Sequence, residues 1–172
     1  EAGYGLLIQH PGLFYLSNEE DRQDYQDLLT RRRHLLSQKV DVSDLSQLIQ
    51  GRPDSRVWSE LGAACFACGA CTTVCPTCSC YDIYDRVDLK GNGQRCRRWD
   101  SCLFRDYDRV AGEHHFRVNR LERVKNRFFH KQVAALEQQH RPGCVGCGRC
   151  QEACPAGIDV VSVLSQLHAE CS

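Results

Sequence analysis

The feature that most constrains this chain is a cysteine motif that occurs twice. The chain has 172 residues and 13 cysteines, and both copies of the motif have the spacing C-x2-C-x2-C-x3-C-P. The first copy contains Cys65, Cys68, Cys71 and Cys75 with Pro76, and the second contains Cys144, Cys147, Cys150 and Cys154 with Pro155. A dense repeat with identical spacing indicates that both copies bind the same kind of metal centre.

Three of the four cysteines in each copy are spaced to hold one iron-sulfur cube. Thiolates at steps of three residues can bind three iron corners, and Gly69 and Gly148 let the backbone approach closely enough to direct N–H groups at the sulfides. In two-cluster ferredoxins the fourth cysteine ligates the other cluster. The pattern therefore predicts two [4Fe-4S] clusters with crossed ligands: Cys65, Cys68, Cys71 and Cys154 for one, and Cys144, Cys147, Cys150 and Cys75 for the other.

A structural zinc site and a disulfide framework are the alternatives, and both fit less well. Four-cysteine zinc sites use two separated C-x2-C pairs, whereas each copy here is one continuous run with a trailing proline. The number of cysteines is odd and no Asn-x-Ser/Thr sequon occurs, so an oxidised, glycosylated secreted scaffold is a poor fit. We therefore expect a reducing, cytoplasmic location.

Composition limits the function further. Lys plus Arg (22) equals Asp plus Glu (22), so no global field attracts a polyanion or an anionic membrane. The apolar stretches are too short to span a bilayer, and no signal peptide is visible. Because the chain starts at Glu1 rather than Met, we expect a fragment or a processed chain. No G-x-G-x-x-G after a strand, no P-loop and no H-E-x-x-H occurs, which agrees with an electron carrier that needs no catalytic side chain.

The pattern along the chain predicts a mainly α fold with a small N-terminal α/β segment. We expect one or two short strands and a turn over residues 1–16, then a helix to Leu36 that is capped by Ser17. Tyr25, Leu28, Leu29 and Leu35 would form its buried stripe. Further helices are expected over 41–49, 115–139 and from beyond Pro155 to His168, with a break at 51–54. The expected domains are residues 1–57, as the end of a larger N-terminal domain, and residues 58–172.

The long segment between the two motifs resembles a known fold. It includes the longest predicted helix, whereas small βαββαβ ferredoxins have only a short connection at this point. Helices separate the cysteine motifs in the α-helical ferredoxin fold of fumarate reductase iron-sulfur subunits and heterodisulfide reductase C subunits. By this analogy residues 58–172 are expected to be an α-helical ferredoxin-like dicluster domain.

The residues around the motifs carry a closer resemblance. From about Trp58 to Asp159 the chain resembles the iron-sulfur β subunit of cytoplasmic sulfhydrogenases and the related A subunit of anaerobic sulfite reductase. The resemblance rests on four segments: Cys75-Pro76-Thr77-Cys78-Ser79-Cys80; Arg98-Trp99-Asp100-Ser101-Cys102; His115-Phe116-Arg117 with Arg120, Arg123, Arg127, His130 and Lys131; and Gly143-Cys144-Val145-Gly146-Cys147-Gly148-Arg149-Cys150.

This resemblance implies a function and partners. The family subunit carries electrons between a flavin subunit that handles NAD(P)H and a catalytic subunit that holds nickel-iron or sirohaem. The family chain is longer at its N-terminus, which implies that Glu1 is an internal start. A different class of function stays open, in which the iron-sulfur clusters only brace a structural or nucleic-acid-binding module. A colourless zinc scaffold is the third possibility.

Several residues lie outside the two predicted cluster sites. The thiols of Cys78, Cys80, Cys96 and Cys102 either hold a third metal or cluster or are buried and supporting thiols, and Cys171 is expected to be incidental.

A basic run also lies outside the predicted sites: Arg117, Arg120, Arg123, Lys125, Arg127 and Lys131. It is either a solvated helix face, a set of charges that offsets the clusters and docks an acidic partner, or a nucleic-acid face. His114, His115 and His130 are weaker ligand candidates, and Trp99 is expected in the core.

Overall fold

The computed structural model describes residues 2–35 and 40–170. The chain divides into two compact units, Glu1–Lys39 and Val40–Ser172. Both cysteine motifs belong to the second unit. Within the described residues, no helix is both long and apolar enough to cross a membrane.

The first unit is helical in its described part. It contains α1 (Ala2–Gln9), the 3-10 turn η1 (Pro11–Leu13) and α2 (Glu19–Leu35). The strand predicted for residues 1–16 is wrong, and residues 2–35 contain no strand. A helix satisfies its backbone groups locally, as in the bond from His10 N to Leu6 O of 3.0 Å, whereas a strand would need a partner.

Helix α2 begins close to the predicted residue but with a different cap. Asn18, not Ser17, caps it, because the Asn18 side chain accepts from Asp21 N and the Asp21 carboxylate accepts from Asn18 N, each at 2.9 Å. The predicted stripe is not buried: no residue of α2 is buried, and Leu35 is 80% exposed. Leu36 lies outside the described residues.

The second unit is built around one helical core. Helices α3 (Leu45–Gln50), α4 (Arg56–Ala64), α6 (Arg120–Phe129) and α9 (Val160–Ala169) supply most of its buried side chains. The rings of Trp58 and Phe128 lie 5.6 Å apart, and Trp58 Nε1 donates to Arg52 O at 2.7 Å. Because α3 packs into this core, the unit begins earlier than the domain boundary predicted at residue 57.

Glycine permits the closest helix contact in this core. A Cβ atom at Gly62 of α4 would lie 2.7 Å from the Cα atom of Leu121 on α6. The two helices can therefore approach only because position 62 has no side chain. This contact fixes the end of α4, from which the first cysteine motif continues.

The predicted helix over 115–139 starts later than expected. Asn119 caps α6, since its side chain accepts from Glu122 N at 2.8 Å. The helix continues without a break through one π-helical turn, η2 (His130–Ala134), into α7 (Ala135–Gln139). Val124 and Phe128 are buried as the periodicity predicts, while Val118 lies before the helix and is exposed.

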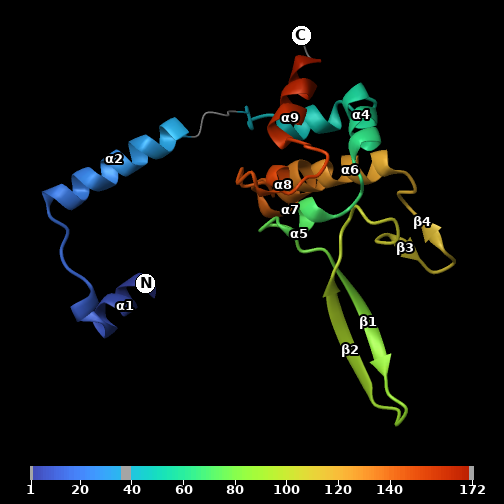
Figure 1. Ribbon diagram of the computed structural model, residues 1–172, viewed down its shortest axis with the longest axis horizontal. Coiled ribbons are helices and arrows are strands. Elements are labelled where there is room, and N and C mark those ends of the chain that lie inside the picture. Colours follow the sequence, from blue (N-terminus) through green and yellow to red (C-terminus); the bar gives the residue numbers. More distant parts are fainter. Residues whose placement is uncertain (1, 36–39, 171–172) are drawn as a thin grey trace. The chain divides into compact units, whose positions relative to one another are not determined.

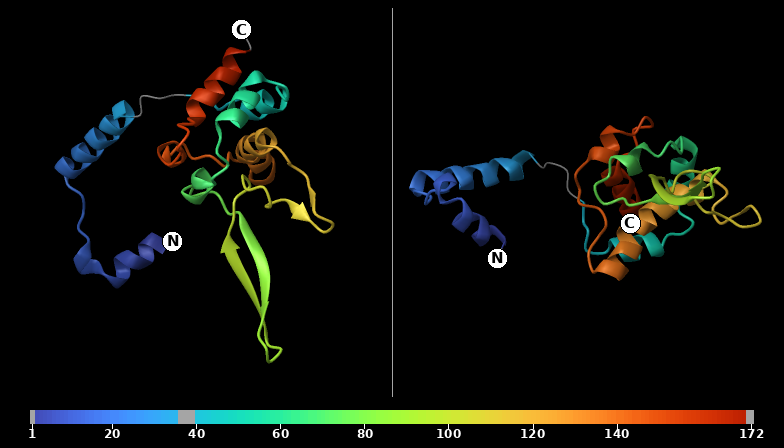
Figure 2. Two further views of the ribbon diagram at one scale, coloured as in Figure 1. Left: turned by 45° about the vertical axis from the view of Figure 1, so that its right-hand side comes forward. Right: turned by 90° about the horizontal axis from the view of Figure 1, so that it is seen from below.

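A β-hairpin extends away from the helices of the second unit (Figure 1). Strands β1 (Tyr81–Val87) and β2 (Gly93–Trp99) pair antiparallel, with Tyr81 opposite Trp99. Strands β3 (Arg109–Val110) and β4 (His114–His115) form a second, very short pair. Trp99 is 74% exposed on this hairpin, so its predicted place in the core is wrong. Figure 2 shows the hairpin projecting in a second view.

Candidate iron-sulfur centres

The two cysteine motifs adopt the same backbone. Gly69, with φ of 75°, precedes the one-turn helix α5 (Ala70–Thr73), and Gly148, with φ of 74°, precedes α8 (Arg149–Glu152). A β-carbon disfavours this left-handed conformation. Helices α5 and α8 pack against each other, which places the two motifs side by side.

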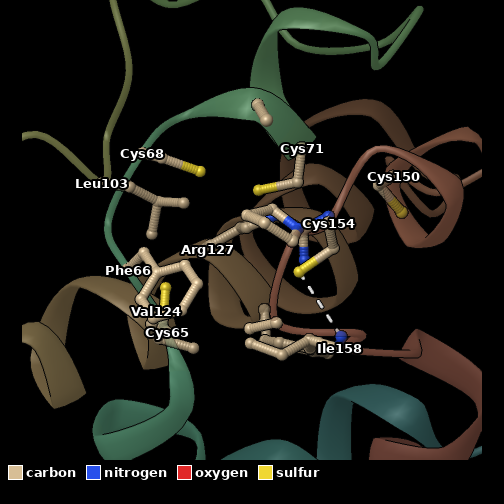
Figure 3. Close-up of a pocket in the computed structure, with 14 residues that line it drawn as sticks. Cys65, Phe66, Cys68, Cys71, Leu103, Val124, Arg127, Cys150, Cys154 and Ile158 are labelled. Atoms are coloured by element: carbon tan, nitrogen blue, oxygen red, sulfur yellow. Dashed lines mark hydrogen bonds between the residues drawn. The ribbon is translucent and has the colours of Figure 1, made fainter.

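One pocket collects cysteines from both ends of the unit (Figure 3). Three of its five cysteines come from the first motif, and Cys150 and Cys154 come from the second. Apolar side chains form much of the remaining wall. The cysteines that line the pocket include the predicted set Cys65, Cys68, Cys71 and Cys154, together with Cys150.

Backbone N–H groups point at two of these sulfurs. Ala67 N donates to Cys65 Sγ at 3.3 Å, and Ile158 N donates to Cys154 Sγ at 3.4 Å, the bond drawn in Figure 3. Such bonds stabilise a thiolate and raise the reduction potential of a cluster that it ligates. Burial raises the pKa of the Cys71 thiol, although the charge of Arg127 counteracts part of this effect.

A second set of contacts ties Cys75 to the start of the second motif. Thr77 Oγ1 lies 3.3 Å from Cys75 Sγ and donates to the carbonyl of Gly143, the residue before Cys144. Lys131 Nζ donates to Thr77 O at 2.7 Å and to Gly143 O at 3.3 Å. Burial alone would raise the pKa of Cys75, but hydrogen bonds from Thr77 and the charge of Lys131 bring it down to about 7.

Buried cations lie between the motifs, where the sequence predicted a basic helix face. Arg123, Arg127 and Lys131 are each exposed by less than a tenth. Arg123 donates to the backbone carbonyls of Leu103, at 2.9 Å, Arg117 and Val118. Arg127 lines the same pocket as Cys71 and Cys150, so its charge acts on a cysteine of each motif. These positions contradict a fully solvated face and favour the interpretation that basic groups offset cluster charge.

Arg127 also tests whether the residues present fit iron-sulfur clusters. Its Nε atom is buried and has no hydrogen-bond partner among the described residues. A buried unsatisfied donor is costly, and this one lines the same pocket as the sulfurs. Thiols to ligate iron, N–H groups to bond sulfur and a buried cation to balance negative charge are the groups that a [4Fe-4S] centre requires. The donor set fits.

The remaining cysteines do not form one four-thiolate site. Cys80 lies close to Cys102, and Cys78 N donates to the carbonyl of Cys75 at 3.2 Å. Cys96 lies on β2 opposite Tyr84, about 10 Å along the strand from Trp99 at the hairpin base. Cys171 lies outside the described residues.

The three candidate histidines are not grouped with the predicted cluster cysteines. His115 Nδ1 lies 3.1 Å from Arg105 O and 3.7 Å from an Asp108 oxygen. The ring of His114 packs edge-on against Phe116 at 5.0 Å. His130 lies at the start of η2 and is exposed. The sequence indicates a role for the basic run but does not reveal that the Thr77 side chain lies against Cys75. The available indication was that Thr77 follows Cys75 by two residues.

Comparisons with known proteins agree with this site. Residues 64–158 match the family model of the 4Fe-4S dicluster domain. Over 166 residues the chain is 33% identical to "Sulfhydrogenase 2 subunit beta" of Pyrococcus furiosus, and the match covers 96% of this chain and 49% of that protein. The chain thus spans about half the length of the curated relative. No solved structure matches it.

These matches confirm the predicted cofactor and the resemblance to sulfhydrogenase β subunits. Two [4Fe-4S] clusters are the cofactors of this chain, and its general role is iron-sulfur electron transfer. The chain belongs to the 4Fe-4S dicluster domain family and is a relative of a sulfhydrogenase β subunit.

Proposed function

We propose that this chain relays single electrons through two [4Fe-4S] clusters, between an NAD(P)H-linked flavin subunit and a catalytic subunit of the hydrogenase or sulfur/sulfite reductase type. The observation that carries the proposal is the shared pocket, in which cysteines of both motifs meet around Arg127. Two redox centres placed this close can exchange electrons without any catalytic side chain. A cytoplasmic location belongs to the same proposal.

The assignment of ligands to the clusters is crossed in this proposal. Cys154 lines the pocket with the first three cysteines of the first motif. The contacts through Thr77 and Lys131 hold the segment that follows Cys75 against the residue before Cys144. The fourth cysteine of each motif, Cys75 or Cys154, is therefore associated with the other motif. This supports crossed ligation, which would join the two motifs into one folding unit.

The protein's own residues do the remaining work. When bound, the clusters supply reversible one-electron chemistry. Burial of Cys65, the N–H bonds to Cys65 and Cys154, and the charges of Arg127 and Lys131 tune the potentials at which electrons are held. The apolar wall of the pocket limits access of water to the first centre.

Metal analysis with EPR spectroscopy tests the proposal. Anaerobically purified protein should contain about eight iron and about eight acid-labile sulfide per chain, and dithionite should produce a paramagnetic signal. Adding the flavin subunit with NAD(P)H should produce the same signal. Clusters that no reductant reduces would instead identify a bracing role in a structural or nucleic-acid-binding module. Zinc without sulfide would sink the electron-transfer proposal.

A further inference from the structure

A second sulfur site lies at the base of the hairpin, outside both predicted cluster sites. Cys80 directly precedes β1, and Cys102 follows β2 by three residues. The hairpin closes at this point through a bond from Asp100 N to Cys80 O of 3.1 Å. Cys80 is 8% exposed and Cys102 is 6% exposed. The fold therefore brings two thiols together in a buried environment.

The two thiols are free and lie close enough to act on each other. The Cys102 thiol and backbone N–H and the Tyr107 hydroxyl act as donors toward the sulfur of Cys80 and favour its thiolate. The interaction between the two thiols lowers the pKa of Cys80 and raises that of Cys102. Such a pair shares one proton, and the resulting thiolate is the reactive form for sulfur chemistry.

This pair also has neighbours that could deliver electrons and protons. Cys78 lies near enough to Cys102 to influence its thiol, and Cys78 N donates at 3.2 Å to the carbonyl of Cys75, the residue that we assign to the second cluster. A short series of cysteines thus links the pair to a cluster ligand. Tyr107 is 37% exposed, so this residue extends from the buried pair to the surface.

We infer that Cys80 and Cys102 form a redox-active dithiol/disulfide couple next to the second cluster. Reduction breaks the Cys80–Cys102 S–S bond, takes two electrons that the two clusters supply one at a time, and takes up one proton by way of Tyr107, which leaves Cys102 as the thiol and Cys80 as the thiolate. Oxidation reverses each of these steps. This inference rests on the proposed relay, because it names the reduced clusters as electron donors and the oxidised clusters as acceptors.

The couple would increase the number of electrons that the chain can hold, because it stores an electron pair. Each cluster carries one electron, whereas a hydride donor on the flavin side delivers two. A disulfide that accepts two electrons lets the chain hold a complete pair beyond its two clusters. Cys96 offers a matched control, because its thiol donates to Gln94 O, at 3.9 Å, and it lies on β2, away from the pair.

An electron count tests the inference on the full, cluster-loaded chain. After oxidation with thionine, coulometric titration with dithionite should consume about four electrons per chain, one for each cluster and two for the disulfide. Cys80→Ser and Cys102→Ser should each consume about two, and Cys96→Ser about four. Non-reducing peptide mapping of the oxidised protein should recover the Cys80 and Cys102 peptides cross-linked.

The outcomes separate this inference from the proposed function. A wild-type chain that consumes about two electrons while both clusters give EPR signals would overturn the disulfide couple and leave the relay intact. Loss of both signals would overturn the relay itself. If the serine variants fail to load iron, peptide mapping of the wild-type chain still decides, because a missing cross-link, or one between other cysteines, contradicts the couple.

Discussion

The two cysteine motifs share a backbone but not an environment. Gly69 and Gly148 have nearly equal φ angles, and each begins a one-turn helix. Yet a Cβ atom at Gly69 would lie 2.7 Å from the ring of Phe104, whereas one at Gly148 would have nothing within 4 Å. Thr72 in the first turn is buried and donates to Gly69 O at 2.7 Å, while α8 has no buried residue.

This difference shows that the motif and its surroundings determine separate properties: the motif determines the local turn, and the surroundings determine its burial. Spacing and glycines determine the local turn, and the glycine conformation and one-turn helix are the same in both copies. The intervening helices and the segment around Ser101–Phe104 then bury one copy more than the other. Since burial and charge set cluster potentials, we expect the two clusters to have different potentials despite their identical ligand spacing.

The largest effect is expected from breaking the crossed ligation. Cys154→Ser should remove, or convert to a three-iron form, the cluster of the first motif, and iron should fall toward about four per chain if that cluster is lost. Combining it with Cys65→Ser should cause little further loss, because both changes affect one cluster. Combining it with Cys144→Ser should remove both clusters. Iron analysis and EPR measure these losses.

The converse substitution supplies the control for this prediction. Cys75→Ser should damage the cluster that is bound mainly by the second motif. If Cys75→Ser instead removed only the cluster of the first motif, each motif would ligate its own cluster, and the crossed assignment would be wrong.

The next largest effect is expected on the cluster midpoint potentials, when the charge of Arg127 or Lys131 is removed. Arg127 faces cysteines of both motifs, whereas Lys131 acts at Cys75 and Cys78. Arg127→Gln should lower both midpoint potentials, because an added electron loses a nearby positive charge. Lys131→Gln should lower mainly the potential of the second cluster. A tenfold change in the one-electron equilibrium, about 59 mV, is the expected scale, measured by EPR redox titration.

Lys125→Gln is the matched control for these charge changes. It removes the same charge from the same helix, but the Lys125 ammonium binds the carbonyl of Pro53 and not a cysteine segment. Its potentials should stay close to those of the wild type. Should Arg127→Gln shift only one cluster, Arg127 would not be shared between the two sites.

Some features of the fold and of the site can be predicted from the sequence alone, and others cannot. The cysteine spacing predicts the local turns, and the pattern of two-cluster ferredoxins predicts that Cys154 lies near the first motif. The apolar periodicity predicts the buried face at Val124 and Phe128. Helical periodicity does not reveal that Arg127 and Lys131 are also buried, since their burial depends on sulfur sites contributed by distant segments.

The failures have a common physical origin. Trp99 was expected in the core because large aromatic residues are usually buried, but it stands on a projecting hairpin. The first residues were expected to be strands because they are apolar and interrupted by glycine. Composition gives a preference, and the available partner surfaces decide the outcome. Cysteine spacing is more informative because a metal cluster accepts few geometries.

A smaller effect is expected from the glycines that begin the two one-turn helices. Gly69→Ala places a left-handed alanine against Phe104 and should cost about 2–4 kcal/mol. Gly148→Ala imposes only the left-handed penalty and should cost about 1–2 kcal/mol. The apparent Tm of anaerobically loaded protein measures the order. Equal losses for the two variants would mean that the contact with Phe104 adds nothing.

The smallest effect comes from one position where the two motifs differ in sequence but not in conformation. Ala67 and Gly146 occupy equivalent places between the first two cysteines, and both have positive φ, 54° and 67°. The first motif therefore has an alanine in the left-handed conformation, where the second has a glycine. Ala67→Gly should relieve this conformation and raise stability by up to about 1 kcal/mol, and Gly146→Ala should lower it by about 1 kcal/mol. Tm shifts of opposite sign in the two variants check this reasoning. A loss of stability in Ala67→Gly would show that the Ala67 methyl group contributes more through packing than its backbone conformation costs.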